Sequence, residues 1–460
     1  MKLPRIYISA AHKSSGKTTL SLGLCQALSE RGKAVQPFKK GPDYIDALWL
    51  GAASKRRCYN LDFNTMTAQE INTALAVKAE GADIAIVEGN KGLYDGLELD
   101  GSTSNAAMAK LIKSPVVLVI DAQGTTRGVA PLLLGYQQFD KAVNIAGVIF
   151  NKVGGLRHQG KLISVTEHYT DMPVLGCVQR SDDMLLAERH LGLMPYNERL
   201  RAHGLIAGIS QKVSDQVDLS ALLAIADTAS DIANSTALKT DCFAGLKIAV
   251  FRDSSFGFYY EDDLDAFTHA GVELVFVNAL SDQALPKVDG IFIGGGFPEI
   301  KIQELSANTA MRTVLHQAIE AGMPVYAECG GLMYLSESIS WNGDTKPMVG
   351  IIPAPIVLSK KPQGRGYVRL TATDAMPWHV ETTSAISGHE FHYSQLVDPE
   401  QKLLHKGAFA YDVERGYGID GKHDGWVYKN LLASYAHMRD TRQFHWVRHF
   451  LQFIKNQAKV

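Results

Sequence analysis

The fold is decided near the start of the chain, by the stretch Arg5-Ile6-Tyr7-Ile8-Ser9-Ala10-Ala11-His12-Lys13-Ser14-Ser15-Gly16-Lys17-Thr18-Thr19. An apolar β-branched run at 5–10 leads into a loop ending in Gly-Lys-Thr, and residues 18–31 follow with apolar side chains at helical spacing. A strand, such a loop and a helix together form a phosphate loop, in which backbone N–H groups and the helix N-terminus bind nucleotide phosphates. Ala11 stands where the usual motif has its first glycine. The strand, loop and helix order still favours this interpretation over a chance tetrapeptide.

The residues of this loop predict an ATP and Mg²⁺ site. Lys17 would neutralise the β- and γ-phosphate oxygens, and the Thr18 hydroxyl would reach Mg²⁺. The candidate ATP-binding residues are Ser15, Gly16, Lys17, Thr18, Thr19 and Asn151, the last directly after a strand expected at 145–150.

Two acidic segments follow later expected strands. Gly41-Pro42-Asp43-Tyr44-Ile45-Asp46 comes after a strand at 35–38, and Glu88 to Gly96 begins at the end of a strand at 84–88. Ligands bind at the carboxyl ends of parallel strands, and Mg²⁺ prefers oxygen ligands. A single aspartate there is equally explained by a solvated loop, but acids after consecutive strands predict a metal site. Its candidate ligands are Thr18, Asp43 and Glu88.

The rest of the chain alternates short apolar runs with helical patterns, which predicts an α/β fold with doubly wound parallel sheets. Further strands are expected at 116–120, 173–177, 246–251, 273–277, 290–293 and 324–328, and further helices at 67–79, 219–237 and 309–321. After Met348 the pattern shifts toward β hairpins, with turn signals at 341–344 and 364–366. We expect two domains, 1–240 and 241–460.

Composition excludes several classes of protein. Lys+Arg 46 against Asp+Glu 48 gives a net charge of −2, so bulk charge predicts no nucleic-acid or membrane partner. No apolar run approaches the roughly 18 residues of a membrane span. The five cysteines are scattered, which argues against a disulfide scaffold and for a reducing cytoplasm.

A second candidate site surrounds Cys329. The segment 324–333 reads as a strand, a sharp turn at Cys329-Gly330 and a helix start, the arrangement of a nucleophile elbow, which favours the thiolate. Gly295, Gly296 and Gly330 could supply oxyanion N–H donors. A buried structural thiol is the alternative.

A thiol nucleophile needs a base, and the residues alone leave this base open. His437 follows a strand-like stretch, while His389 and His392 are rivals.

Several motifs together resemble the cobyrinic acid a,c-diamide synthase family, glutamine-dependent enzymes that amidate carboxylates of a tetrapyrrole. The resemblance covers nearly the whole chain. Its motifs lie at 35–46, 60–62, 88–96, 188–193, 256–260, 294–299, 328–331, 388–394 and 434–437.

This resemblance implies an N-terminal dethiobiotin synthetase-like P-loop domain and a C-terminal class I glutaminase-like domain. It implies a carbon–nitrogen ligase that uses ATP, Mg²⁺ and L-glutamine, with a tetrapyrrole polycarboxylate as its small-molecule substrate and a homodimer as one possible assembly. Cys329 would be the glutaminase nucleophile and His437 its base. The implied substrate-binding residues are Tyr44, Ile45, Asp46, Asn90, Lys91 and Asp95.

Some positions depart from the family pattern. Asn90-Lys91 replaces a Val-Met pair beside the substrate edge, which keeps sirohaem or sirohydrochlorin open as a substrate beside cobyrinate. No carboxylate lies two residues after His437, where many class I glutaminases have one; Arg439 stands there. Another group must therefore support His437.

One alternative belongs to another class of protein: a partitioning-type ATPase switch carrying an inactive glutaminase-like module. Such switches carry a signature lysine in a glycine-rich loop, which His12-Lys13-Ser14-Ser15 fits poorly. The intact Cys329 elbow also argues against it.

Overall fold

The computed structural model describes residues 2–181, 184, 188–189, 192–198, 202–232, 242–379, 385–398 and 400–457. The chain divides into two compact units, Met1–Leu238 and Lys239–Val460. The expected boundary near residue 240, and residues 190 and 191 of the motif at 188–193, lie outside the described residues.

The first unit is built on a seven-stranded sheet in the order β3-β2-β4-β1-β5-β6-β7, with every neighbouring pair parallel. This is the doubly wound sheet that the sequence predicts. In this order β1 and β2 both lie beside β4, so the loops that follow these three strands meet at one edge. The strands are β1 (Arg5–Ala10), β2 (Val35–Lys40), β3 (Tyr59–Leu61), β4 (Ile84–Glu88), β5 (Val116–Asp121), β6 (Ile145–Val153) and β7 (Val174–Gln179).

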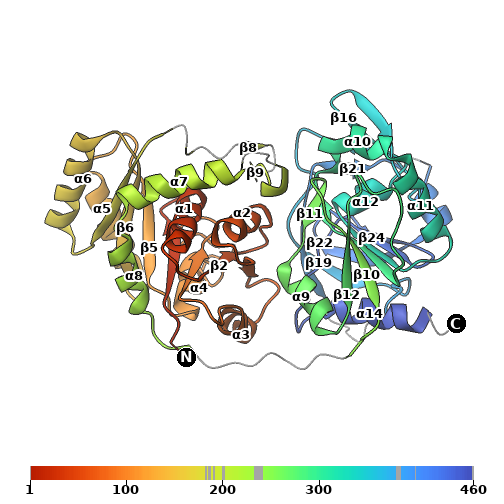
Figure 1. Ribbon diagram of the computed structural model, residues 1–460, viewed down its shortest axis with the longest axis horizontal. Coiled ribbons are helices and arrows are strands. Elements are labelled where there is room, and N and C mark those ends of the chain that lie inside the picture. The colour runs from red at the N-terminus through yellow and green to blue at the C-terminus, as the bar shows by residue number, and fades with distance from the viewer. Residues whose placement is uncertain are drawn as a thin grey trace. The chain divides into compact units, whose positions relative to one another are not determined.

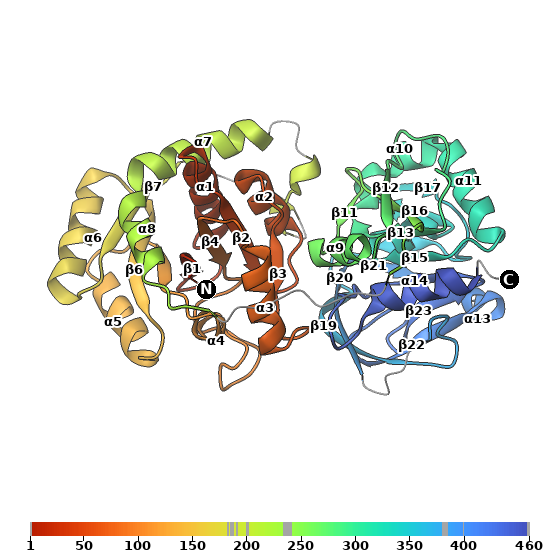
Figure 2. The same ribbon diagram turned by 60° about the horizontal axis from the view of Figure 1, so that its bottom comes forward.

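Helices cover both faces of this sheet because successive strand residues point to opposite sides. Ile6 and Ile8 pack into the core beneath one set of helices, whereas Tyr7 lies in the core beneath the other. The first set is α1 (Lys17–Glu30), α2 (Ile45–Ser54), α7 (Ala202–Gln216) and α8 (Leu219–Asp227), and the second is α3 (Ala68–Lys78), α4 (Asn105–Leu111), α5 (Val129–Phe139) and α6 (Leu156–Tyr169). Figure 1 labels these helices, and Figure 2 shows α1, α2 and α7 on one side of the strands and α3, α4 and α5 on the other.

The second unit contains a nine-stranded sheet in the order β12-β10-β13-β15-β24-β23-β22-β19-β20. The pairs from β12 to β24 are parallel and those from β24 to β20 are antiparallel. The parallel strands are β10 (Lys247–Phe251), β12 (Glu273–Val277), β13 (Gly290–Ile293), β15 (Val325–Glu328) and β24 (Leu431–Ser434). The others are β19 (Gly364–Ala372), β20 (Ile386–His392), β22 (Ala408–Arg415) and β23 (His423–Tyr428).

Two cores cover this sheet. One includes side chains of α10 (Ile302–Ala307), α11 (Thr309–Glu320) and α12 (Gly330–Leu335), and the other those of α9 (Glu261–His269) and α14 (Trp446–Gln457), as Figure 2 shows for α11 and α14. Smaller elements are β11 (Phe256–Phe258) with β14 (Gly295–Gly296), the sheet of β16 (Ser338–Trp341), β17 (Asp344–Pro347), β18 (Ile356–Leu358) and β21 (Ser394–Leu396), and helix α13 (Lys402–Lys406).

Four local expectations are corrected by the structure. The helix expected at 219–237 ends at Asp227, where Thr228 forms the C-cap, and residues 233–237 lie outside the described part of the chain. Strand β2 extends two residues further, to Lys40, and Asn151 lies within β6 rather than after it. The turn expected at 364–366 is the first part of β19.

Among the described residues, no helix combines the length and apolarity needed to cross a membrane.

Candidate functional site

The loop between β1 and α1 turns sharply at Gly16, whose φ of 88° lies in the left-handed region. A Cβ atom added there would lie 2.1 Å from Nδ2 of Asn151, which donates a hydrogen bond of 2.9 Å to the carbonyl of Ser15. Gly16 is therefore required both by backbone conformation and by space. Of the predicted nucleotide residues, the structure brings Asn151 of β6 directly against the loop.

Lys17 occupies the first turn of α1 and is only 6% exposed. Burial lowers the pKa of its ammonium to about 8, although the carboxylates of Glu88 and Asp46 oppose this shift. A buried cation that lacks full compensation gains most from an arriving anion such as a phosphate. Thr18 and Thr19 follow in the same turn and are partly buried.

A cluster of charges forms where β2 and β4 end. Lys39 Nζ lies 2.5 Å from Asp46 Oδ2, 2.7 Å from Glu88 Oε1 and 3.7 Å from Asp43 Oδ2. The Thr18 hydroxyl contacts the same two nearer carboxylates, at 2.8 Å from Glu88 and 3.1 Å from Asp46. The structure thus places the predicted metal residues and Asp46 around Lys39, which is not among the predicted site residues.

This cluster shifts the pKa of each of its members. Burial opposes the charge of Lys39, but Asp46 and Glu88 outweigh it and hold the pKa of Lys39 above its usual range. Burial also opposes ionisation of Asp46, yet Lys39 lowers the pKa of that carboxyl, whereas burial raises the pKa of Glu88. Desolvation and the charge of Asp46 raise the pKa of Asp43 to about 7, although about 33% of its side chain remains accessible.

The same residues can be tested as Mg²⁺ ligands. Among the described residues, no three His, Cys, Asp or Glu side chains converge as a ready metal cluster. Glu88 Oε2, however, is buried without a hydrogen-bond partner, and the Thr18 oxygen lies beside the same carboxylate. Mg²⁺ is usually held by one or two carboxylates together with substrate phosphates, so this donor set fits a magnesium ion that arrives with a nucleotide.

The loop after β4 is fixed against β1 by Asn105. The Asn105 amide donates to the carbonyl of Gly92 at 2.7 Å, while its oxygen accepts from Tyr7 OH at 2.8 Å and from the Asn90 backbone N–H at 3.3 Å. Asp95 accepts from Gly92 N–H at 3.0 Å. These bonds hold the 89–96 loop beside the phosphate loop.

The remaining predicted substrate residues have varied environments. Lys91 and Asp95 are exposed, and Asn90 is partly buried. Tyr44 is the N-cap residue of α2 and is buried. Ile45 packs against the core, so packing alone accounts for this side chain.

In the second unit, Cys329 follows β15 with φ 46° and ψ −98°, directly before α12. Such a conformation is strained for a residue with a Cβ atom. The thiol is 6% exposed. The structure therefore has the elbow that the sequence predicts.

The charge state of Cys329 differs from the expected thiolate. Burial, together with the carboxylates of Glu299 and Glu328, raises the pKa of the thiol, so Cys329 is a neutral thiol at neutral pH in this arrangement. The short helix α12 does not outweigh the burial. A base is therefore needed to take its proton.

His437 follows β24, the strand that pairs with β15. Cys329 N–H donates to the carbonyl of Ser434, the last residue of β24, at 2.7 Å, and His437 lies three residues further on. Its ring stacks on His389 with centroids 4.8 Å apart, and its Nδ1 lies 3.5 Å from Glu328 Oε2.

The rival histidines have other contacts. Burial lowers the pKa of His389 well below its usual value, which keeps this ring neutral. His392 stacks on Tyr435 at 3.8 Å and its Nδ1 lies 2.8 Å from the Ser394 carbonyl. His437 is thus the histidine that follows the strand adjacent to β15.

The predicted oxyanion glycines converge on the same place. A Cβ atom added to Gly330 would lie 2.8 Å from the backbone nitrogen of Gly296, and one added to Gly295 would lie 2.5 Å from Cε1 of His437. Only residues without side chains allow this close approach. The arrangement of a thiol, an imidazole and closely packed backbone is suited to attack on an amide carbonyl.

Three residues outside the predicted set therefore belong to these sites: Lys39, Asn105 and Glu328. The signal for Lys39 is a lysine pair at the end of a buried strand, directly before Gly41-Pro42-Asp43. Asn105 carries no local sequence signal, because its partners come from β1 and from the loop after β4.

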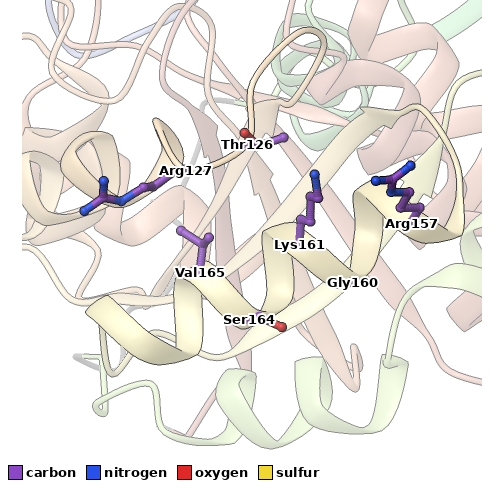
Figure 3. A pocket seen from close by; sticks show the side chains of 7 residues that line it. All are labelled: Thr126, Arg127, Arg157, Gly160, Lys161, Ser164 and Val165. Atoms are coloured by element: carbon purple, nitrogen blue, oxygen red, sulfur yellow. The ribbon is translucent and has the colours of Figure 1, made fainter.

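A separate hollow of about 470 Å³ lies along the first turns of α6, and the side chains that line it carry three cations, Arg127, Arg157 and Lys161. Figure 3 shows these side chains together with Thr126, Ser164, Val165 and the backbone of Gly160. None of the predicted site residues lines this hollow.

Each of the two units contains a segment that matches a known protein family. Residues 7–193 match the CobQ/CobB/MinD/ParA nucleotide binding domain, and residues 247–443 match the CobB/CobQ-like glutamine amidotransferase domain. The chain is 43% identical to a cobyrinate a,c-diamide synthase of Magnetococcus marinus, over 99% of this chain and 98% of the relative. It is 39% identical to the protein of the same name from Methanosarcina acetivorans (95% and 92% covered) and 37% identical to that from Dehalococcoides mccartyi strain CBDB1 (100% of both chains).

With two matched domains and this degree of identity over the full length, the protein is a carbon–nitrogen ligase of the glutamine amidotransferase type and belongs to the cobyrinate a,c-diamide synthase family.

Proposed function

We propose that this enzyme amidates peripheral carboxylates of a tetrapyrrole, with ATP as the activating co-substrate and glutamine as the nitrogen donor. The observation that carries the proposal is the presence of two sites in one chain. One is a phosphate loop with a buried Lys17, and the other is a Cys329 elbow after β15, which pairs with β24, the strand that precedes His437. The relatives named cobyrinate a,c-diamide synthase favour cobyrinate as the ring.

In the glutaminase half, which we assign to residues 241–460, the Sγ atom of Cys329 attacks the side-chain amide carbon of glutamine. His437 takes the thiol proton and gives it to the departing nitrogen, which leaves as ammonia. Water then cleaves the thioester and releases glutamate. The backbone of Gly295, Gly296 and Gly330 lines the position of the developing oxyanion. The neutral resting thiol supports this sequence, because it makes proton transfer to His437 part of the attack.

In the ligase half, which we assign to residues 1–240, a substrate carboxylate oxygen attacks the γ-phosphorus of ATP, giving an acyl phosphate and ADP. Ammonia then attacks the acyl carbon and inorganic phosphate leaves. Lys17 and Lys39 are positioned to compensate phosphoryl charge, and the loop bearing Ser15, Gly16 and Asn151 would hold the phosphates. Magnesium held by Thr18, Glu88 and Asp43 would supply further charge neutralisation.

Substrate recognition is assigned to the edge beside this cluster. Tyr44 and Asp46 lie at the N-cap and in the first turn of α2, after β2. Asn90, Lys91 and Asp95 lie on the loop after β4, which Asn105 fixes against β1. Lys91 is an exposed cation, as recognition of a polycarboxylate requires. We also predict that the protein is located in the cytoplasm and forms a homodimer. Analytical ultracentrifugation tests the homodimer.

Two variants test the division of labour. Cys329→Ala should abolish amidation with glutamine but keep amidation with added ammonium, whereas Lys17→Ala should lose both. If Cys329→Ala is folded and loses the ammonium-driven reaction to the same extent, the two-site scheme is wrong. Absence of glutaminase activity in the unaltered enzyme would favour the partitioning-type switch instead.

The substrate is identified by offering cobyrinate, hydrogenobyrinate, sirohydrochlorin and sirohaem separately with ATP, Mg²⁺ and glutamine. Mass spectrometry counts the carboxyl groups converted to amides on each ring. Amidation of cobyrinate is the expected result, and conversion of sirohaem-type rings alone would replace it.

A further inference from the structure

The carboxylate that supports His437 is missing from its usual sequence position, and the structure offers a replacement. We infer that Glu328, the residue directly before the Cys329 nucleophile, orients His437 and selects its tautomer. The inference rests on the proposed function, because it requires Cys329 and His437 to hydrolyse glutamine. Glu328 would be a positioning residue that acts only through His437.

The two side chains meet in a buried environment. Glu328 Oε2 lies 3.5 Å from His437 Nδ1, and each side chain is 3% exposed. Glu328 is the last residue of β15 and pairs in register with Ser434, the last residue of β24. His437 lies three residues beyond β24, where its backbone exchanges hydrogen bonds of 2.8 and 3.3 Å with His389 of β20. The contact is thus set by the end of β15 and by a segment held to a neighbouring strand, which fixes positions more firmly than a free loop does.

The other oxygen of the carboxylate is held in place. Glu328 Oε1 accepts a hydrogen bond of 2.7 Å from Tyr326 OH and one of 2.9 Å from the backbone N–H of Met438. Met438 is the residue after His437, so the carboxylate anchors the backbone of the histidine as well as facing its ring. With Oε1 held by these two donors, Oε2 is left facing Nδ1.

The residue at the usual position points elsewhere. Arg439, two residues after His437, donates to Asp262 at 2.6 Å, and its guanidinium lies 5.0 Å from the ring centre of Tyr260. Burial, with the charge of Arg439, lowers the pKa of the stacked His389 well below its usual value, so this ring is neutral and supplies no negative charge.

A second carboxylate–histidine contact in the unit does not fit this role. Glu390 Oε2 lies 3.6 Å from His392 Nε2, but Glu390 accepts the backbone N–H groups of Tyr417 and Gly418 at 2.7 and 2.9 Å. It therefore holds a turn, and His392 does not follow a strand adjacent to β15.

The chemistry follows from the contact. A carboxylate facing Nδ1 favours the tautomer with a proton on Nδ1, which leaves the Nε2 lone pair to take the thiol proton. The imidazolium that forms is then stabilised by the carboxylate of Glu328, and Nε2 returns the proton to the departing ammonia. The 3.5 Å separation is longer than a normal hydrogen bond, and catalytic contacts of this kind are often long without substrate and shorten in its complex.

Glu328→Gln tests this inference sharply. The glutamine oxygen can still accept from Tyr326 and Met438, but its NH₂ group would face Nδ1 and force the proton onto Nε2, the wrong tautomer. We expect the glutaminase kcat to fall by roughly 10²–10⁴-fold with little change in KM, since loss of the orienting carboxylate has this effect in triads. Ammonium-driven amidation should stay unchanged.

Tyr326→Phe is the matched control. It removes a hydrogen bond to the same carboxylate but leaves its charge beside His437, so the glutaminase kcat should remain within about threefold of the unaltered enzyme. An equal loss in Tyr326→Phe and Glu328→Gln would show a merely structural role and overturn the inference.

A second readout follows the thiol itself. The pH dependence of Cys329 alkylation by iodoacetamide reports proton transfer to His437, whose ring faces Glu328 and His389. Two effects oppose each other in Glu328→Gln. Loss of the carboxylate charge by itself lowers the pKa of the thiol, whereas loss of the group that supports His437 moves the midpoint upward. We expect the second effect to prevail, and an unchanged or lowered midpoint in a folded variant would contradict the inference. Should Glu328→Gln not fold, Glu328→Asp must keep more glutaminase activity than Glu328→Ala, or the inference fails.

These variants distinguish failure of the proposed function from failure of the role inferred for Glu328. If Cys329→Ala keeps its glutamine-driven activity, the proposed function itself is wrong. If Cys329→Ala loses that activity while Glu328→Gln keeps its kcat, the proposed function stands and the role of Glu328 is refuted.

Discussion

Replacing Lys39 with methionine removes the one ammonium that lies between Asp46 and Glu88, at 2.5 and 2.7 Å. The side chain of Lys39 is 2% exposed and that of Glu88 is fully buried, so water cannot take over the lost interaction. Removing one partner of a buried ion pair costs about 3–5 kcal/mol. For a domain of this size that corresponds to a fall in Tm of roughly 6–20 °C for the first unit.

The loss should also depend on pH. Without Lys39, the pKa values of both carboxyl groups rise above their unfolded values, so the folded variant binds more protons than the unfolded chain. A raised carboxyl pKa means that stability falls as pH increases through it. The difference between Lys39→Met and the unaltered protein should therefore be larger at pH 8 than at pH 6. Added Mg²⁺ should stabilise the variant more than the unaltered protein, because it supplies charge to the same carboxylates.

Calorimetry measures the transitions, and hydrogen exchange of peptides from α1 and α14 assigns each transition to its unit. Lys13→Met is the matched control, since it removes an exposed ammonium from the phosphate loop. A Lys39→Met variant whose first unit melts within about 2 °C of the unaltered protein at pH 8 would refute the reasoning.

Three further predictions concern single contacts. Gly295→Ala places a methyl group 2.5 Å from Cε1 of His437 and should lower glutaminase kcat by at least about tenfold while ammonium-driven activity persists; equal losses in both reactions would contradict it. Gly16→Ala would meet Asn151 at 2.1 Å and strain a φ of 88°, so isothermal titration should show ATP affinity reduced at least about tenfold; unchanged affinity would contradict the assigned loop geometry. Because the pKa of Lys17 is about 8, part of its amine is neutral at pH 8.5 and should take up a proton when ATP binds. Titration calorimetry in buffers of different ionisation enthalpy measures this uptake. If Lys17→Met keeps the full uptake, another group is responsible for it.

Much of the first site follows from sequence because strand ends can be located by apolar runs. Thr18 and Glu88 were selected from separate segments, and the strand order β2-β4-β1 brings them to 2.8 Å. Lys39 could not be selected in this way, since the expected strand ended at residue 38 and a lysine inside a sheet is unusual. Only the paired carboxylates make its burial possible.

The second site shows a similar division. The Cys329 elbow and its glycines have local signatures, so their positions could be predicted from the sequence. The role proposed for Glu328 could not, because its contact with His437 joins the end of β15 to the segment after β24, about 100 residues further along the chain, and no local pattern encodes such a pairing. The neutral state of the Cys329 thiol could not be predicted either, because burial of the side chain, rather than its position at a helix start, sets its pKa.

The end of the helix expected at 219–237 was wrong for another physical reason, since α8 ends at Asp227. Alanine-rich composition favours a helix but does not by itself determine where it ends. Leu219, Leu222 and Ala226 are buried on one face of α8, and the buried Ala229 and Ile232 continue the apolar pattern beyond it. The helix nevertheless ends after Asp227, where the N–H groups of Thr228 and Ala229 bond to the carbonyls three residues back. Composition alone therefore extended the helix too far.

The backbone of Cys329, with φ 46° and ψ −98°, implies a trade-off between activity and stability. A residue in such a conformation costs the fold of the order of 1–3 kcal/mol, a cost that glycine largely avoids. Cys329→Gly should therefore make the second unit more resistant to unfolding while removing its nucleophile. A descendant of this chain that is no longer selected for glutamine hydrolysis would accordingly become more stable by losing Cys329. Glycine at this position would then indicate a glutaminase-like unit that binds a ligand or partner but no longer hydrolyses glutamine.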